Sequence, residues 1–283
     1  MNKNFIIRNM RQDELKIAID WARQEGWNPG IHDHETFYYA DPNGFFISEL
    51  DGEAIAVGSA VCYDEFFGFC GLYIVKPKYR GEGYGMQITR RRLEHIGDRN
   101  AGIDGVIQNI KIYERIGYKT AYRNYRYAGI ANSKIKLNDP HVKTYQHDNM
   151  FEDIKKLDRQ LFPASRTPFL DAWLNQKDAK VLVYMQDSNL LGYTVRRKCF
   201  KGFKIGPLFA STTDVANALF IALQDDIEGQ EIYLDIPEIN SKALELVKNH
   251  HMSLVFETAR MYLKEVPKLD YDQMYGVTTF ELG

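Results

Sequence analysis

The order of expected helices and strands runs twice along this chain, and that repeat constrains the fold more than any other feature of the sequence. In the first half, expected antiparallel strands are followed by a strand at 68–75, a helix at 86–96, a strand at 105–108, a helix at 110–116 and a strand at 118–127. After a polar stretch at 131–139 the same order returns and ends with a strand at 253–262. The 283 residues are about twice the usual length of one folding unit. We therefore predict two α+β domains of one topology, 1–130 and 140–283, each with a mixed sheet flanked by helices.

Each half also contains an expected antiparallel hairpin. Strand-like runs at 44–50 and 54–61 flank Asp51-Gly52, a dipeptide typical of two-residue turns. In the second half, runs at 180–185 and 190–195 flank a polar three-residue turn. The hairpins support two related units in tandem.

Composition excludes several classes of function. Apolar residues make up 45% of the chain and charged residues 26%, which is typical of globular proteins and not of disordered or fibrous ones. The 36 Lys and Arg against 38 Asp and Glu leave a net charge of -2, so no overall field attracts nucleic acid or anionic lipid. We find neither a membrane-spanning run nor a signal-peptide core near Met1. We therefore expect a soluble cytoplasmic protein with no nucleic-acid or membrane partner; a homodimer is left open.

The cysteines and histidines show no metal-site pattern. The cysteines are Cys62, Cys70 and Cys199. None belongs to a CxxC pair, and Cys70, inside an apolar run, is expected to be a small core residue rather than a nucleophile. His32 with His34, and the neighbours His250 and His251, have no further ligands at suitable spacing. We expect no metal.

The segment with the clearest chemistry is Arg80-Gly81-Glu82-Gly83-Tyr84-Gly85, between an expected strand at 68–75 and an expected helix at 86–96. Free backbone N–H groups and the helix dipole make such a junction favourable for an anion. The glycines permit positive φ and close approach, and Arg80 adds charge-assisted hydrogen bonds. We expect a diphosphate here. The three arginines at 90–92 are either further phosphate contacts or a solvated helix face.

Two common phosphate-binding motifs do not fit this loop. The dinucleotide fingerprint GxGxxG fails because Met86 stands at its last glycine, which argues against a dinucleotide-dependent oxidoreductase. The P-loop pattern is absent too. What remains is Arg-x-x-Gly-x-Gly, with the strand 71–75 before it and the segment Tyr113–Tyr118 after it. This combination resembles the acyl-CoA-binding motif of the GCN5-related N-acetyltransferase superfamily.

The resemblance covers the whole chain. Residues 1 to about 130 resemble an active-type domain of the superfamily, and 140–283 resemble the degenerate acetyltransferase-like domain fused to it in one bacterial subgroup. Where the second half would carry the glycine loop it has Ala210-Ser211-Thr212-Thr213-Asp214, without glycine or arginine. Asp214 is expected to cap the following helix and to repel a diphosphate.

We therefore expect the second half to bind no CoA. Instead it would pack beside the first half and shape the acceptor pocket, through Tyr193, Glu257 or Arg260.

The resemblance implies acetyl-CoA as the acetyl donor. Pantetheine would pair with the backbone of one strand, the glycine loop would hold the diphosphate, and an asparagine before the last short helix would contact CoA. The implied cofactor-binding residues are Tyr73, Ile74, Val75, Arg80, Gly81, Glu82, Gly83, Tyr84, Gly85, Met86 and Asn109. The family protonates the leaving thiolate from a tyrosine whose position Tyr113 occupies. The alternative is that Tyr113 only packs its helix.

The implied reaction is direct attack of a primary amine on the thioester in a ternary complex, with transfer of acetyl. The near-zero net charge favours a small-molecule acceptor, bound by Trp27, Asn28, His32 and Asp33 in a turn-rich loop. A protein amine remains an alternative, as does a non-catalytic acyl-CoA sensor. The base is either a water chain to bulk solvent or one of four side chains. These four are His32, Asp33, Asp64 and Glu65.

Overall fold

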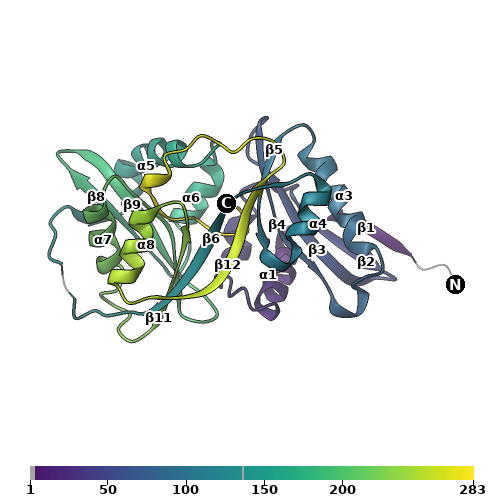
Figure 1. Cartoon of the computed structure of the whole chain (residues 1–283), viewed down its shortest axis with the longest axis horizontal. Coiled ribbons are helices and arrows are strands. Elements are labelled where there is room, and N and C mark those ends of the chain that lie inside the picture. The colour runs from purple at the N-terminus through teal and green to yellow at the C-terminus, as the bar shows by residue number, and fades with distance from the viewer. Residues whose placement is uncertain (1–3, 136) are drawn as a thin grey trace.

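A single mixed sheet runs through both halves of the chain in the computed structural model, which describes residues 4–135 and 137–283 (Figure 1). Its strand order is β1-β2-β3-β4-β5-β12-β6-β11-β10-β9-β8-β7, with β13 paired to β10. The strands are β1 Phe5–Asn9, β2 Phe45–Leu50, β3 Glu53–Cys62, β4 Phe67–Val75, β5 Asn100–Val106, β6 Lys119–Ile130, β7 Val142–Thr144, β8 Ala179–Gln186, β9 Asn189–Lys198, β10 Phe203–Ala210, β11 Glu231–Pro237, β12 Ser253–Tyr262 and β13 Met274–Gly276.

Helices cover both faces of this sheet (Figure 1). They are α1 Leu15–Gln24, α2 Asp33–Phe37, α3 Tyr84–Ile96, α4 Ile110–Ile116, α5 His147–Leu161, α6 Thr167–Leu174, α7 Thr213–Ala222 and α8 Ser241–Asn249, with short 3₁₀ turns at Gln12–Glu14, Pro77–Tyr79, Ile107–Asn109 and Tyr271–Gln273. The predicted mixed sheet flanked by helices is confirmed. No helix in the described part of the chain has the length and apolar character needed to cross a bilayer.

The last strand of each sequence half completes the sheet of the other half. Strand β12 lies between β5 and β6, antiparallel to both, and β6 continues into the second half by pairing with β11. The predicted division into 1–130 and 140–283 stays a prediction for the folding units. The structure adds that the two stretches exchange strands across that boundary.

Side chains of β3 show how the core is divided between the two faces of the sheet. Val57 and Val61 join a cluster that contains residues of α1, α2, α5 and α6, whereas Ala56 and Ala60 join a cluster with α3. Neighbouring residues of a strand point to opposite faces, so α1 and α3 lie on opposite sides. The first cluster contains Leu15 of α1 together with helices of the second half, so the halves share one apolar core.

Strands β4 and β5 pair over only half their length. They run parallel from Phe67–Cys70 against Asn100–Ile103, and no ladder pair follows. Beyond Cys70 the register between β3 and β4 shifts, and Leu72 has a φ of 46°, which marks a bulge. The two strands therefore separate at the bulge.

One predicted strand is misplaced. The sequence predicts a strand at 105–108, whereas β5 runs from Asn100 to Val106 and a 3₁₀ turn follows. Two glycines interrupt the run of apolar side chains from which a strand is predicted. A Cβ on Gly102 would lie 2.9 Å from the Phe69 ring, and one on Gly105 would lie 2.6 Å from the Tyr113 ring. The glycines are there because aromatic rings occupy the space of their side chains.

Candidate active site

A cavity of about 520 Å³ begins where β4 and β5 separate. Its walls come from β4, the start of α3, β5, α4, β6 and the second half of the chain. We call one part the interdomain end, because residues distant in sequence meet there. The residues of the interdomain end are Trp27, Asp104, Arg126, Phe256, Thr258, Phe280 and Glu281.

The glycine loop is built to accept an anion. Gly81 and Gly83 have φ of 83° and 87°, and a Cβ on either would meet nothing within 4 Å, so conformation rather than space requires glycine there. Gly83 is also the N-cap of α3. Among the described residues, the N–H groups of residues 81–85 donate no hydrogen bond to the protein. The loop thus presents free donors at a helix N-terminus.

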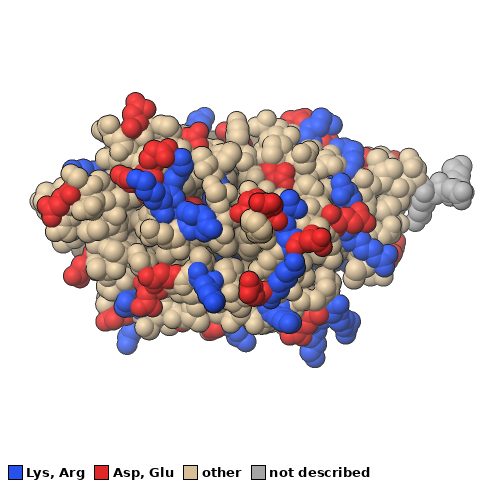
Figure 2. All heavy atoms as spheres, turned by 90° about the horizontal axis from the view of Figure 1, so that it is seen from above, with Lys and Arg blue, Asp and Glu red and all other residues tan. Residues whose placement is uncertain are grey.

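Arg80 lies at the start of this loop. Its Nε donates to the Val75 carbonyl at 2.8 Å, and its guanidinium pairs with Glu25. The side chain is 49% exposed, so it can turn toward a bound phosphate. Charges of both signs are interspersed over the face shown in Figure 2, and neither sign covers it. Attraction of an anion here is therefore local.

Most predicted cofactor residues meet at the cavity. The residues that line it are Tyr73, Ile74, Val75, Arg80, Gly85, Met86 and Asn109. The other four do not line it; they form the loop itself, beside its mouth. These four are Gly81, Glu82, Gly83 and Tyr84.

The arginines at 90–92 have three different environments. Arg92 is buried, and it donates to the carbonyls of Ser59 and Gly71 on either side of the bulge, at 2.8 and 3.3 Å. The Arg91 guanidinium lies 4.8 Å from the centre of the Phe46 ring, and Arg90 is exposed. Arg92 therefore stabilises the bulge and also lines the cavity. A solvated helix face is wrong for this residue, while a phosphate contact stays a prediction.

Tyr113 lines the cavity from α4, with its ring against Gly105 of β5. Burial raises the pKa of its hydroxyl, and a hydrogen bond with the Asn109 side chain opposes that rise only in part. The hydroxyl therefore stays protonated at neutral pH and can donate a hydrogen bond or a proton into the cavity.

Of the four residues predicted to bind the acceptor, only Trp27 lines the cavity. Asn28 exchanges two hydrogen bonds with the backbone of Lys201, at 2.8 and 2.9 Å. His32 lies 2.9 Å from Asp178. Asp33 is fully buried, where it accepts from Arg197 at 3.0 Å and from the Gly30 amide at 2.7 Å. These three polar groups hold the first half against the second.

None of the four side chains weighed as a base lines the cavity. His32 and Asp33 are engaged with the second half, as described above. Asp64 accepts from the amides of Phe66 and Phe67 at 2.8 and 2.7 Å, which is a turn cap, and Glu65 is exposed.

The second half does contribute to the cavity, although not through the expected residues. Tyr193 is buried and donates to Asp158 at 2.6 Å. Glu257 pairs with Arg123 in a partly exposed ion pair, and Arg260 is buried against Asp104 at 2.7 Å. The residues from the second half that line the cavity are Phe256, Thr258, Phe280 and Glu281. Alternation along β12 is the signal that could have predicted Phe256 and Thr258, because these two residues share the face opposite to Glu257.

The junction in the second half that corresponds to the glycine loop begins its helix with a side-chain cap instead of a glycine. The N-cap of α7 is Thr212, whose hydroxyl accepts from the Val215 amide at 3.3 Å. Thr212, rather than the expected Asp214, therefore caps this helix.

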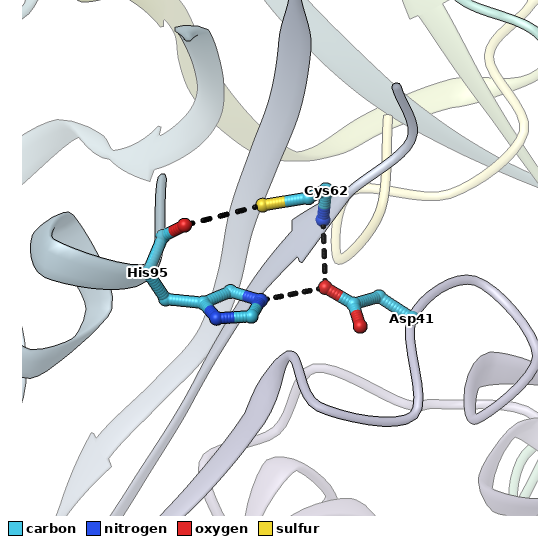
Figure 3. Close-up of side chains that lie close together, drawn as sticks. All are labelled: Asp41, Cys62 and His95. Atoms are coloured by element: carbon cyan, nitrogen blue, oxygen red, sulfur yellow. Dashed lines mark hydrogen bonds and ion pairs between the residues drawn. The ribbon is translucent and has the colours of Figure 1, made fainter. Parts of the chain in front are cut away.

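A second polar cluster lies away from the cavity (Figure 3). His95 Nε2 lies 2.7 Å from Asp41 Oδ2, and Cys62 donates from its amide to the same oxygen at 3.0 Å. The ligand atoms of the three side chains lie within 4.8 Å of one another. Hydrogen bonding to Asp41 raises the pKa of His95 to about 9. The histidine is therefore protonated at neutral pH, and an ion pair accounts for the cluster.

We expect this ion pair to make stability fall in alkaline solution. The folded-state pKa of about 9 exceeds the ordinary histidine pKa of about 6.5, so the contribution is complete below pH 6.5 and is lost as pH rises through 9. The ion pair contributes about 3 kcal/mol to the free energy of unfolding. Denaturant unfolding between pH 6 and 10 measures it, with EDTA present. Asp41→Asn should flatten the profile over this range, and an unchanged profile would contradict the assignment.

The chain is similar to known acetyltransferases. Two family profiles, each described as an acetyltransferase (GNAT) domain, match residues 41–120 and 154–276. The holothin acyltransferase of Pseudoalteromonas sp. (strain SANK 73390) is 27% identical over 272 residues, covering 96% of this chain and 92% of that protein. The uncharacterized N-acetyltransferase YitH of Bacillus subtilis (strain 168) is 23% identical over 232 residues, covering 81% and 80%.

A solved structure of a candidate acetyltransferase from Pyrococcus horikoshii has the same fold. It superposes with a TM-score of 0.83 at 24% identity, and the match covers 99% of this chain and 96% of that one. The chain belongs to the GCN5-related N-acetyltransferase (GNAT) superfamily and carries two of its domains in tandem. It is an acyltransferase, as the sequence predicts.

Proposed function

We propose that this protein transfers an acetyl group from acetyl-CoA to the primary amine of a small molecule. One observation carries the proposal: a single cavity leads from the glycine loop, past the gap between β4 and β5, to the interdomain end. A CoA diphosphate at the loop would leave pantetheine to follow residues 73–75 along β4. The thioester would then lie near the bulge and Tyr113.

The size and covering of the interdomain end favour a small acceptor. The cavity of about 520 Å³ is within the range of small-molecule sites, about 300–1,000 Å³, and it must hold part of the cofactor as well. Phe256 and Phe280 of the second half cover its interdomain end. The Pseudoalteromonas relative is named for acyl transfer to holothin, not to a protein.

The chemistry follows from this arrangement. The amine nitrogen attacks the thioester carbonyl carbon, the C–S bond breaks, and the amine loses one proton. Holding both reactants in line supplies on the order of 7 kcal/mol of the barrier. Backbone N–H groups at the bulge stabilise the developing oxyanion, and the Tyr113 hydroxyl donates to the sulfur that leaves as thiolate.

The test is a CoA-release assay with acetyl-CoA over panels of small amines and peptides. We expect release to saturate with a small primary amine, and mass spectrometry should find that amine heavier by one acetyl group. Peptide amines should give no more release than buffer. Release with peptides alone would overturn the small-molecule assignment. Binding of acetyl-CoA without release for any amine would favour a sensor.

A further inference from the structure

The interdomain end contains two polar groups that the protein itself leaves largely uncommitted. Glu281 is only 4% exposed, and in the described part of the chain its carboxylate has one hydrogen-bond donor, the Thr279 hydroxyl. Among the described residues, no Lys, Arg or His nitrogen lies within 4.0 Å of a Glu281 carboxylate oxygen, so the carboxylate has no ion-pair partner. Thr258, 2% exposed, has a buried hydroxyl with no hydrogen-bond partner among residues 4–135 and 137–283. Buried groups of this kind are rare in folded proteins unless a ligand or water satisfies them.

The other charges at this end are already neutralised. Asp104 accepts two hydrogen bonds from Arg260, at 3.0 and 2.7 Å, and one from Asn124 at 2.7 Å. Arg126 gives two hydrogen bonds to Asp235, at 2.7 and 2.8 Å, and a third to the Trp27 carbonyl. Of the charged groups that line the cavity here, Glu281 is the one left to receive a donor from a ligand.

Glu281 also lies where the reaction takes place. A Cβ built on Gly71 would stand 2.1 Å from the Glu281 carbonyl oxygen and 3.0 Å from its Cα. Gly71 immediately precedes the bulge residue Leu72, and its own carbonyl is held by Arg92. The end of the chain thus lies against β4 at the bulge, in the middle of the molecule between the two halves (Figure 1).

The walls around Glu281 are aromatic. Trp27, Phe256 and Phe280 line the same end of the cavity, and the rings of Phe256 and Phe280 are 6.4 Å apart. The Arg126 guanidinium already lies 5.7 and 4.8 Å from the centres of the Phe256 and Phe280 rings. The rings therefore offer a ligand an apolar surface that excludes water, which strengthens a charge-assisted hydrogen bond to a carboxylate. An ammonium group carried on an apolar or aromatic body matches this combination.

We propose that Glu281 and Thr258 of the second half bind the acceptor amine as its ammonium form, on an apolar or aromatic body held between Trp27, Phe256 and Phe280. This rests on the proposed function and names the acceptor class. Glu281 then holds the ammonium while it loses one proton to solvent, which frees the nitrogen lone pair. The free amine attacks the thioester, and its second proton is lost as the amide forms and the thiolate leaves. The second half would thus provide a binding residue of the active site.

Cations near Glu281 argue for a different ligand, and the experiment must separate the two. Burial tends to raise the pKa of Glu281, but Lys204, Thr279, Arg197 and Arg126 together hold it below its usual range. Arg197 and Arg126 are each held by an aspartate, while Lys204 donates to the Trp27 carbonyl at 3.1 Å. If these cations dominated, the pocket would prefer an anion.

The experiment is calorimetric titration of the full-length protein, saturated with CoA, with benzylamine, benzyl alcohol and benzoate. We expect benzylamine, a cation at pH 7, to bind at least tenfold more tightly than either analogue. The Glu281→Gln variant should bind benzylamine at least tenfold more weakly than the wild type. Glu257→Gln, the same change at a partly exposed ion pair on β12, should bind benzylamine like the wild type.

Thr258→Val provides a second variant that does not depend on how well Glu281→Gln folds. Because the hydroxyl has no partner, its removal should leave the free energy of unfolding unchanged or higher while benzylamine binding weakens. Preferred binding of benzoate, or full benzylamine affinity in both variants, would overturn the proposal. Failure of the proposed function is distinguishable, since it would appear in the CoA-release assay as no release with any small amine, whereas failure of this inference would appear only in the benzylamine titrations.

Discussion

Replacing Tyr113 by phenylalanine is expected to lower turnover by about 10²- to 10⁴-fold while the affinity for acetyl-CoA stays nearly constant. The ring lies against Gly105 and its contacts survive the change, so only the hydroxyl is lost. A tyrosine is a weaker acid than a thiol, and burial raises the pKa of Tyr113 further. The Tyr113 hydroxyl therefore acts mainly by donating a hydrogen bond to the sulfur as the thiolate develops, and solvent completes the protonation. Thiol release gives kcat, and calorimetry gives the dissociation constant.

The matched control is Tyr125→Phe, which removes a hydroxyl that donates to Glu238 at 2.8 Å. Tyr125 does not line the cavity, so turnover should stay within about twofold of wild type. The variant should also stay folded, because a partly exposed hydrogen bond contributes only about 1 kcal/mol to stability. If Tyr113→Phe retained a third or more of wild-type turnover, Tyr113 would be a packing residue of α4.

Replacing Asp104 by alanine is expected to destabilise the protein by about 3–5 kcal/mol. Its carboxylate is fully buried on β5 and pairs with Arg260 of the exchanged strand β12, whose side chain is 7% exposed. The substitution leaves a guanidinium buried without its counter-charge at the junction of the two halves. Denaturant unfolding of the full chain measures the loss.

Glu257→Ala is the control for this pair. Glu257 lies on the same strand as Arg260 and pairs with Arg123 across β6, but the two side chains are 35% and 45% exposed. Exposed ion pairs contribute about 0–1 kcal/mol, so a small effect is expected. Equal destabilisation by the two substitutions would show that the Asp104 pair is not the link between β5 and β12 described here.

The strand exchange could not be predicted from the sequence, although both strands could. The patterns at 118–127 and 253–262 predicted β6 and β12 in nearly their observed positions. Hydrophobic alternation indicates that a strand exists, but the choice of neighbour depends on contacts between distant residues. Asp104 and Arg260 are 156 residues apart, and nothing local to either marks the other as its partner.

The two parts of the candidate active site also differ in how well the sequence predicted them, because one is built from neighbouring residues and the other from distant ones. The proposed CoA-binding part is local, because one loop and the strand before it supply most of the residues, and a motif could be recognised. The interdomain end, where we propose that the acceptor binds, joins Trp27, Thr258 and Glu281 from three distant segments. The loop at 27–33 was predicted to bind the acceptor on account of its varied polar groups, yet most of these hold the second half in place, as Asp33 does with Arg197.

Titration calorimetry with acetyl-CoA tests the central claim most directly. We predict saturable binding of one molecule per chain, because the junction at α7 lacks a free glycine loop. S-acetylpantetheine, which lacks the diphosphate, should bind at least tenfold more weakly, a difference of about 1.4 kcal/mol. If the two compounds bound equally well, the glycine loop would not be the diphosphate site. If acetyl-CoA gave neither heat nor a thermal shift, the whole account of the site would be contradicted.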